Sequence, residues 1–286
     1  MKGTVNLSAA TVSRRAWYLL LVLPSLLFVV YPMGVLLATS FSEPGTGSLT
    51  LEHYERIFLT PRYLARTWNT LSLSFTVTLV SVFVGVAISL YLWRRTFPGK
   101  ALLANLLVIP YMTPHYIIAL AAIYIFGNNG VLAYAMRRLS GDPALAPPVE
   151  FMFTYHGIVA VFVFNSVAMV VFLTLAFLAG IPKHFEDAAR SLGASTFTIM
   201  RRVILPMAAP AIAGSAVLVF SRVMVDYIIV QTIGGVRYST LAVEVANRFF
   251  GYIEHGVPAA LASLLSVLTM ALMYTYLYWS RWRGRR

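Results

Sequence analysis

The chain has 286 residues, of which 59% are hydrophobic and only 11% are charged. Soluble domains typically carry about 25% charged residues, so this composition excludes both an ordinary soluble enzyme and a disordered chain. The 22 Lys and Arg outnumber the 10 Asp and Glu, and the resulting charge of +12 raises the question of nucleic-acid binding. The absence of Cys rules out disulfides and thiolate metal sites.

Six apolar stretches are long enough to cross a membrane as helices, for which roughly 20 residues are needed. They cover residues 16–41, 70–93, 101–126, 157–181, 207–233 and 259–279. Arg14 and Arg15 precede the first stretch, as they would in a cleaved signal peptide, but the apolar run is longer than a typical signal sequence. We therefore expect an all-α integral membrane protein, with a tail at 1–15 and one transmembrane domain at 16–286.

The basic residues predict the orientation of these six helices. An even number of crossings puts both termini on one side, and that side carries 14 basic residues against Glu186 and Asp187. The opposite side carries seven basic and seven acidic residues, so the whole net charge lies on the side of the termini. Cytoplasmic loops are enriched in Lys and Arg, which predicts cytoplasmic termini and explains the charge without nucleic acid.

The long loop between the fourth and fifth stretches has a helical pattern. Phe185, Ala188, Ala189 and Leu192 share one helix face, and Gly193 is a suitable stop. Ser195 or Thr196 can then cap a second short helix before the proline-marked entry to the fifth stretch. An exposed apolar helix face is expected to be buried against another surface. The spacing alone does not distinguish between the lipid surface and a partner protein.

The same loop carries a family resemblance. The string DAARSLGASTFTIMRRVILP resembles the EAA loop of bacterial ABC-importer permeases, in which E-A-A precedes a Gly by four residues and I-x-L-P follows after nine more. Here these positions are Asp187-Ala188-Ala189, Gly193 and Val203-Ile204-Leu205-Pro206. Asp187 replaces the usual Glu, and Val203 replaces the usual Ile. Over nearly the whole chain the resemblance is closest to permeases for spermidine/putrescine, ferric iron and phosphonates.

The resemblance implies a permease subunit that moves a small polar solute, polyamine-like or else ferric iron or a phosphonate, across the bacterial inner membrane. A periplasmic or lipid-anchored binding protein would deliver the solute, and a second permease subunit would complete the pathway. The loop 181–206 would be a two-helix coupling loop that docks on a dimer of cytoplasmic ATPases. Its implied coupling residues are Phe185, Glu186, Asp187, Ala188, Ala189, Arg190, Leu192, Gly193, Leu205 and Pro206.

ATP and Mg²⁺ are expected on the partner ATPase, because this chain lacks a phosphate-binding loop of the form GxxxxGK[ST]. Its one Gly-Lys pair, Gly99-Lys100, is followed by Ala101. The five His have no metal-ligand spacing, and no nucleophile motif is present, so we expect no catalytic residue and no metal site. An ion-coupled secondary transporter working without an ATPase is the alternative.

Polar residues inside the apolar stretches are candidates for the substrate pathway, because charge is costly in a membrane. Arg222 and Asp226 lie four residues apart on one helix face and can pair. Pro110 and Pro114 should kink or break the third stretch. The full candidate set is Tyr111, His115, Arg222, Asp226 and Gln231. An internal ion pair or a satisfied helix bend is the structural alternative, and Asn165 is expected to bond between helices.

Overall fold

The computed structural model describes residues 7–43, 45–142, 152–235, 237–251 and 255–283, with side chains described between 20 and 280. Residues 1–6 of the expected tail and the proline-rich segment 143–151 lie outside this description. The described helices are α1 (Leu7–Ser40), α2 (Glu52–Leu59), α3 (Pro61–Arg94), α4 (Lys100–Met112), α5 (His115–Phe126), α6 (Val131–Ser140), α7 (Tyr155–Ala179), α8 (His184–Ser191), α9 (Thr196–Ile199), η1 (Met200–Ile204), α10 (Leu205–Val225), η2 (Val230–Gly234), α11 (Leu241–Ala246), η3 (Asn247–Gly251) and α12 (Gly256–Arg283).

Within these residues, six helical stretches are long and apolar enough to cross a membrane, as the sequence predicts. They are Leu20–Ser40, Pro61–Arg94, His115–Ser140, Tyr155–Ala179, Thr196–Val225 and Gly256–Ser280. The expected third span at 101–126 is divided into α4 and α5, and its qualifying part runs on into α6. The expected fifth span at 207–233 instead begins at Thr196 and stops at Val225.

The centre of the molecule is a close pair of helices, α3 and α7, flanked by α10. Small buried side chains on α3, Ser74, Ser81 and Ser89, lie on the same face as Gly85 and let the two backbones approach. A Cβ added at Gly85 would lie 2.7 Å from Val170 Cβ of α7. Small residues take this role in membranes because lipid supplies no hydrophobic force between helices.

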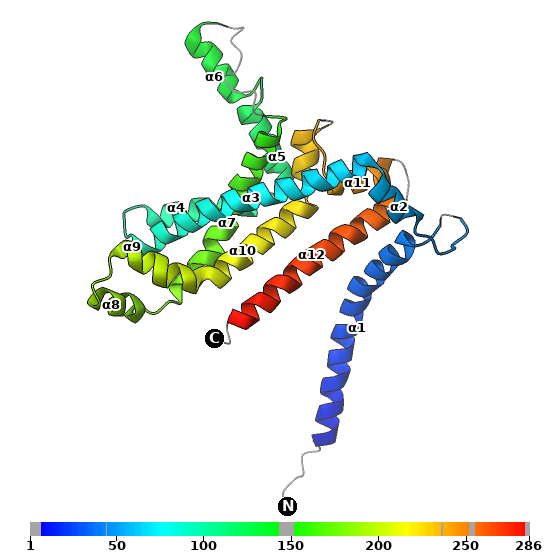
Figure 1. Ribbon diagram of the computed structural model, residues 1–286, viewed down its shortest axis with the longest axis horizontal. Coiled ribbons are helices and arrows are strands. Elements are labelled where there is room, and N and C mark those ends of the chain that lie inside the picture. The colour runs from blue at the N-terminus through cyan, green and yellow to red at the C-terminus, as the bar shows by residue number, and fades with distance from the viewer. Residues whose placement is uncertain (1–6, 44, 143–151, 236, 252–254, 284–286) are drawn as a thin grey trace, which may run out of the picture.

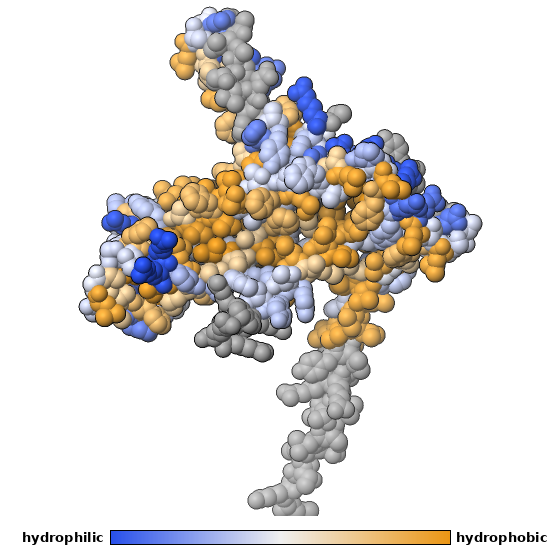
Figure 2. All heavy atoms as spheres, viewed as in Figure 1, coloured by the Kyte–Doolittle hydropathy of each residue, from blue (hydrophilic) through white to orange (hydrophobic). Residues whose placement is uncertain are grey.

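Two parts of the chain leave this body (Figure 1). Helix α1 packs against α12 but otherwise projects away from the body, while α5 and α6 project on the opposite side of the view. Many of their apolar side chains are exposed, for example Phe28 at 79% and Tyr124 at 71%. Apolar residues cover the middle of the body, and charged residues gather toward its two ends (Figure 2). This distribution fits a body surrounded by lipid or by another membrane subunit.

The two ends of the body differ in structure (Figure 1). Helices α8 and α9 form one end, called here the α8 end. Helices α2 and α11 lie at the other, called the α2 end. Helix α12 starts beside α2 and α11 and runs away from that end.

Candidate functional site

A hydrogen bond from another helix stabilises the interruption between α4 and α5. Pro114 has no N–H to donate to the carbonyl of Pro110, four residues earlier, so this carbonyl is left without a helical partner. Asn165 of α7, only 1% exposed, donates Nδ2–H to Pro110 O at 2.6 Å. The expected break at the prolines and the expected interhelical bond of Asn165 are both confirmed, and they are one feature.

The break brings His115, the first residue of α5, against α10. His115 Nδ1 is hydrogen-bonded to Asp226 Oδ2, and Arg222 Nη2 is hydrogen-bonded to His115 Nε2. Because Arg222 can only donate, the imidazole accepts from it at Nε2 and links the guanidinium to the carboxylate. The three side chains therefore form a chain of charge-assisted hydrogen bonds. We call this set the polar triad.

Asp226 also ends α10. Its backbone is extended, with φ −75° and ψ 123°, and its Oδ1 accepts the backbone N–H of Ile229 at 3.0 Å. A carboxylate that caps the following turn provides the partner that a broken helix needs. The sequence predicts an uninterrupted span through Ile233, and this prediction is wrong. The helix ends before Asp226, whose carboxylate stabilises the break, and the hydropathy of the surrounding residues gives no sign of it. Two interrupted helices thus meet at the polar triad, an arrangement that transporters use for binding sites.

The other two pathway candidates lie differently. Tyr111 is within electrostatic range of Arg222, and its ring packs edge-on against Phe172 with centroids 6.1 Å apart. Gln231 lies in η2 beyond the break, is exposed, and its backbone N–H bonds to Tyr227 O at 2.8 Å. The structure therefore brings His115, Arg222 and Asp226 together, with Tyr111 nearby and Gln231 outside the triad.

Helix α8 presents much of the expected apolar face. Leu192 is 89% exposed and Phe185 is 40% exposed, so this face is open in the described structure. Ala189 was expected on the same face, but it packs inward against the cluster formed by Leu178, Ile199 and other residues. Arg190 Nη2 lies 3.5 Å from Glu186 Oε2, so these two implied coupling residues form an ion pair.

The turn after α8 follows the expected pattern. Gly193 has a φ of +80°, a conformation that L side chains rarely adopt. Ser195 accepts the backbone N–H of Thr198 at 3.3 Å and caps α9. The expected second short helix of the loop corresponds to α9. It is not a separate element, because α9 continues through η1 into α10. The π turn, with Leu205 N–H bonded to Met200 O, lies just before Pro206, whose ring an α-helical turn would crowd.

At the α2 end the structure contains a charge cluster that the sequence reasoning missed. Glu244 of α11, only 1% exposed, accepts from Arg62 Nη2 at 3.0 Å and from Arg248 Nε at 2.9 Å. Arg66 Nε lies 3.9 Å from the same carboxylate. Glu244 thus ties α11 and η3 to the start of α3. In the sequence, only the four-residue spacing of Glu244 and Arg248 could have predicted one of these ion pairs.

Beside this cluster, Tyr238 donates its hydroxyl to Asn69 O at 2.8 Å, and its ring packs against that of Tyr155. Burial raises the pKa of Tyr238 to about 12, because the phenolate would lose its hydration. The phenol therefore stays protonated and keeps donating over the physiological range. The segment after the fifth span is held to α3 by this bond as well as by Glu244.

Comparison with known proteins gives the family. The model of the binding-protein-dependent transport system inner membrane component matches residues 81–281. A protein of Salmonella typhi named as permease of a 2-aminoethylphosphonate transport system is 26% identical over 91% of this chain and 89% of its own length. The spermidine/putrescine permease PotC of Haemophilus influenzae is 27% identical over 86% of this chain and 91% of its own.

Solved structures agree with this assignment of the fold. A bacterial ABC transporter that imports alginate superposes with a TM-score of 0.73 at 16% identity, covering 96% of this chain and 94% of that one. The family match, the relatives and the six apolar helices favour an ABC-importer permease over a secondary transporter. This chain is a multi-pass permease subunit of the bacterial inner membrane and belongs to the family of inner membrane components of binding-protein-dependent transport systems.

Proposed function

We propose that the apolar face of α8 docks on a separate cytoplasmic ATPase and couples ATP hydrolysis to transport. The exposure of Leu192, at 89%, is the observation that carries this proposal, because a leucine in water loses about 1.5–3 kcal/mol of burial energy. Phe185 and Ala188 extend the same face, and the ion pair of Glu186 with Arg190 lies beside it. ATP and Mg²⁺ bind the ATPase in this proposal, and the chain itself catalyses nothing.

The connection from α8 to the polar triad supports this role. Residues from Thr196 to Val225 form one continuous helical rod, which ends directly before Asp226. A displacement of α8 that pivots at Gly193 would be passed along this rod as a rigid-body motion. Closure of the ATPases would therefore change the packing of Arg222 and Asp226 against His115.

The same proposal implies an orientation of the protein in the membrane and a set of other partners. The α8 end, with its excess of basic residues, faces the cytoplasm together with both termini. The α2 end faces a periplasmic or lipid-anchored binding protein, and Arg137 and Arg138 of α6 lie on the exposed outer part of the chain. A second permease subunit, identical or homologous, completes the pathway. A related alginate importer has been solved with its substrate-bound periplasmic protein.

Within the set of small polar solutes, the triad favours one that carries both an amine and an acidic group, such as an aminoalkylphosphonate. Both oxygens of Asp226 are engaged, by His115 and by Ile229, so a single carboxylate offers little to a polyamine or to ferric iron. Arg222 has further N–H groups that can hold a phosphonate oxygen. The Salmonella relative is named for a solute of this class.

Crosslinking tests the docking proposal directly, because the chain has no Cys and a single introduced thiol is unique. We expect Leu192→Cys to crosslink to the ATPase in the assembled importer. Leu139→Cys on α6, equally exposed at 89%, should not. Crosslinks from position 192 to phospholipid alone, with no nucleotide-hydrolysing subunit attached, would overturn the proposal.

Two glycines provide a matched test of coupling. Gly193→Val and Gly141→Val place a branched side chain at similar positive φ values, +80° and +73°, in positions with no neighbour within 4 Å. The backbone strain is about the same, of order 1–3 kcal/mol. Only Gly193→Val should lower the number of solute molecules imported per ATP hydrolysed. Equal ratios in the two variants would contradict coupling through α8.

Uptake by the assembled importer in proteoliposomes tests the solute class. We expect ATP-dependent uptake of 2-aminoethylphosphonate and little uptake of putrescine. Asp226→Asn should lower that uptake roughly tenfold or more, since a hydrogen bond to a charged group contributes about 1.5–3 kcal/mol. Asp142→Asn, on the exposed segment after α6, is the control. Uptake of putrescine or ferric iron without uptake of aminophosphonate would refute this choice.

A further inference from the structure

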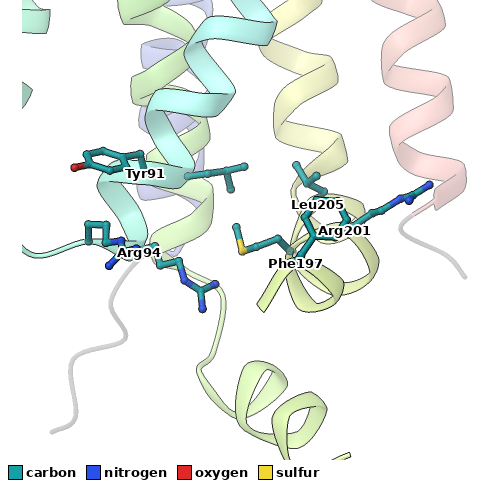
Figure 3. A pocket seen from close by; sticks show the side chains of 8 residues that line it. Tyr91, Arg94, Phe197, Arg201 and Leu205 are labelled. Carbon is teal, nitrogen blue, oxygen red and sulfur yellow. The ribbon is translucent and has the colours of Figure 1, made fainter. Parts of the chain in front are cut away.

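A cavity of about 510 Å³ lies at the α8 end, between the last turns of α3 and the segment formed by α9 and η1 (Figure 3). It is lined by Leu90, Tyr91, Arg94, Arg95, Phe197, Met200, Arg201 and Leu205. The exposed apolar face of α8 does not contribute to this lining. The cavity is therefore distinct from the docking face proposed above.

The walls of this cavity are apolar and poorly covered. Tyr91 is 55% exposed on the α3 side, and Phe197 is 71% exposed on the α9 side. Figure 3 shows Tyr91 and Arg94 on one wall with Phe197 and Leu205 on the other. The lining includes two exposed aromatic residues, which suit contact with an apolar chain better than contact with water alone.

The charged residues of the lining are all basic. Arg94 donates Nη2–H to Thr196 Oγ1 at 3.2 Å, while its Nη1 is buried and has no hydrogen-bond partner among the described residues. Arg95 follows it directly and is exposed. Arg201 lies on the opposite wall, and its guanidinium is directed away from Arg94 in Figure 3. A guanidinium with an unsatisfied N–H at a boundary of low dielectric constant favours an anion.

We propose that this cavity binds an anionic phospholipid of the cytoplasmic leaflet. The phosphate lies between Arg94 and Arg95, and one acyl chain runs along Leu90, Tyr91 and Phe197. A free phosphate ion would use the arginines but leave the apolar walls uncovered, so the two features together select a lipid. Basic pockets between membrane helices on the cytoplasmic side are suited to anionic headgroups.

A lipid in this position would connect two moving parts. Its phosphate is held by α3, which packs on α7, and its chain contacts the first turns of the rod that begins at Thr196. Occupancy would therefore stabilise one arrangement of the rod relative to the bundle. This consequence depends on the orientation proposed above, whereas lipid binding itself does not require the ATPase.

Native mass spectrometry of the full-length chain tests the site. The protein is released from nanodiscs of equal phosphatidylglycerol and phosphatidylcholine, and retained lipids are counted for wild type, Arg94→Gln/Arg95→Gln and Lys183→Gln/Arg202→Gln. The second pair removes two charges from the same end outside the cavity. We expect only Arg94→Gln/Arg95→Gln to lower phosphatidylglycerol retention, by about 30-fold. Each basic residue near an anionic surface contributes about 1 kcal/mol, and the loss of two such residues corresponds to this factor.

Three outcomes would overturn the proposal. Equal losses in the two double variants would mean a general surface charge effect. Displacement of phosphatidylglycerol by millimolar inorganic phosphate would mean a free-anion site. Release of the lipid when the ATPase binds would mean that the cavity belongs to the ATPase interface. Because docking on the ATPase is tested separately by crosslinking from Leu192→Cys, failure of lipid binding can be distinguished from failure of the coupling role of α8.

Discussion

Replacing Glu244 by Gln should destabilise the α2 end of the protein. The carboxylate is 1% exposed, accepts hydrogen bonds from Arg62 and Arg248, and forms a longer ion pair with Arg66. The pair with Arg62 contributes little, because that side chain is 52% exposed and hydrated. Arg248 and Arg66 are 14% and 23% exposed, so removal of their carboxylate leaves positive charge in a largely buried place.

Removing one partner of a buried ion pair costs about 3–5 kcal/mol. Gln keeps one acceptor oxygen, which places the expected loss near the lower limit, at about 3 kcal/mol or roughly a hundredfold in the unfolding equilibrium. Unfolding in mixed detergent micelles with increasing dodecyl sulfate, followed by helical circular dichroism, measures this change. Limited proteolysis should also cut the segment around α11 faster.

Glu55→Gln is the matched control, because Glu55 is an exposed carboxylate on α2 at the same end. We expect its midpoint to equal that of the wild type. Adding Arg248→Gln to Glu244→Gln should recover part of the loss, because the double change leaves less positive charge buried without its carboxylate. If Glu244→Gln and Glu55→Gln unfold at the same midpoint, the Glu244 cluster does not stabilise the protein.

Three further changes test other contacts. Asn165→Leu should cost about 1–3 kcal/mol in the same unfolding assay, since Pro110 O loses its donor, and an unchanged midpoint would show that the break does not need this bond. Gly85→Val should destabilise by about 1–3 kcal/mol because Val170 leaves no room for a side chain, whereas Gly34→Val, with no neighbour within 4 Å, should be neutral. For Tyr238 the folded pKa of about 12 lies above the ordinary 10.0, so its contribution to stability is complete below pH 10 and is lost as the pH rises toward 12. Tyr238→Phe should flatten this alkaline decline and remove the late-titrating tyrosinate absorbance, and an identical alkaline profile in the variant would contradict the assignment.

Much of the architecture follows from patterns that are local in the chain. Apolar runs of about membrane length give the six crossings, and the pair Pro110 and Pro114 marks the break in the third one. Gly193 and Ser195 end one short helix and begin the next through interactions within three or four residues. Hydropathy fails at Asp226, because a capped break inside an apolar run does not change its average composition.

The polar triad and the Glu244 cluster were decided by tertiary structure. His115 is 111 residues from Asp226, and Arg62 is 182 residues from Glu244, so no spacing rule connects either pair. The sequence marks these side chains as costly to bury, but their partners depend on which helix faces which, and that is set by the packing of α3, α7 and α10. The sequence alone therefore determined the crossings, the charge asymmetry and the loop motif. Packing between distant helices decided which polar groups meet, because a buried charge is stable only where the fold brings it a partner.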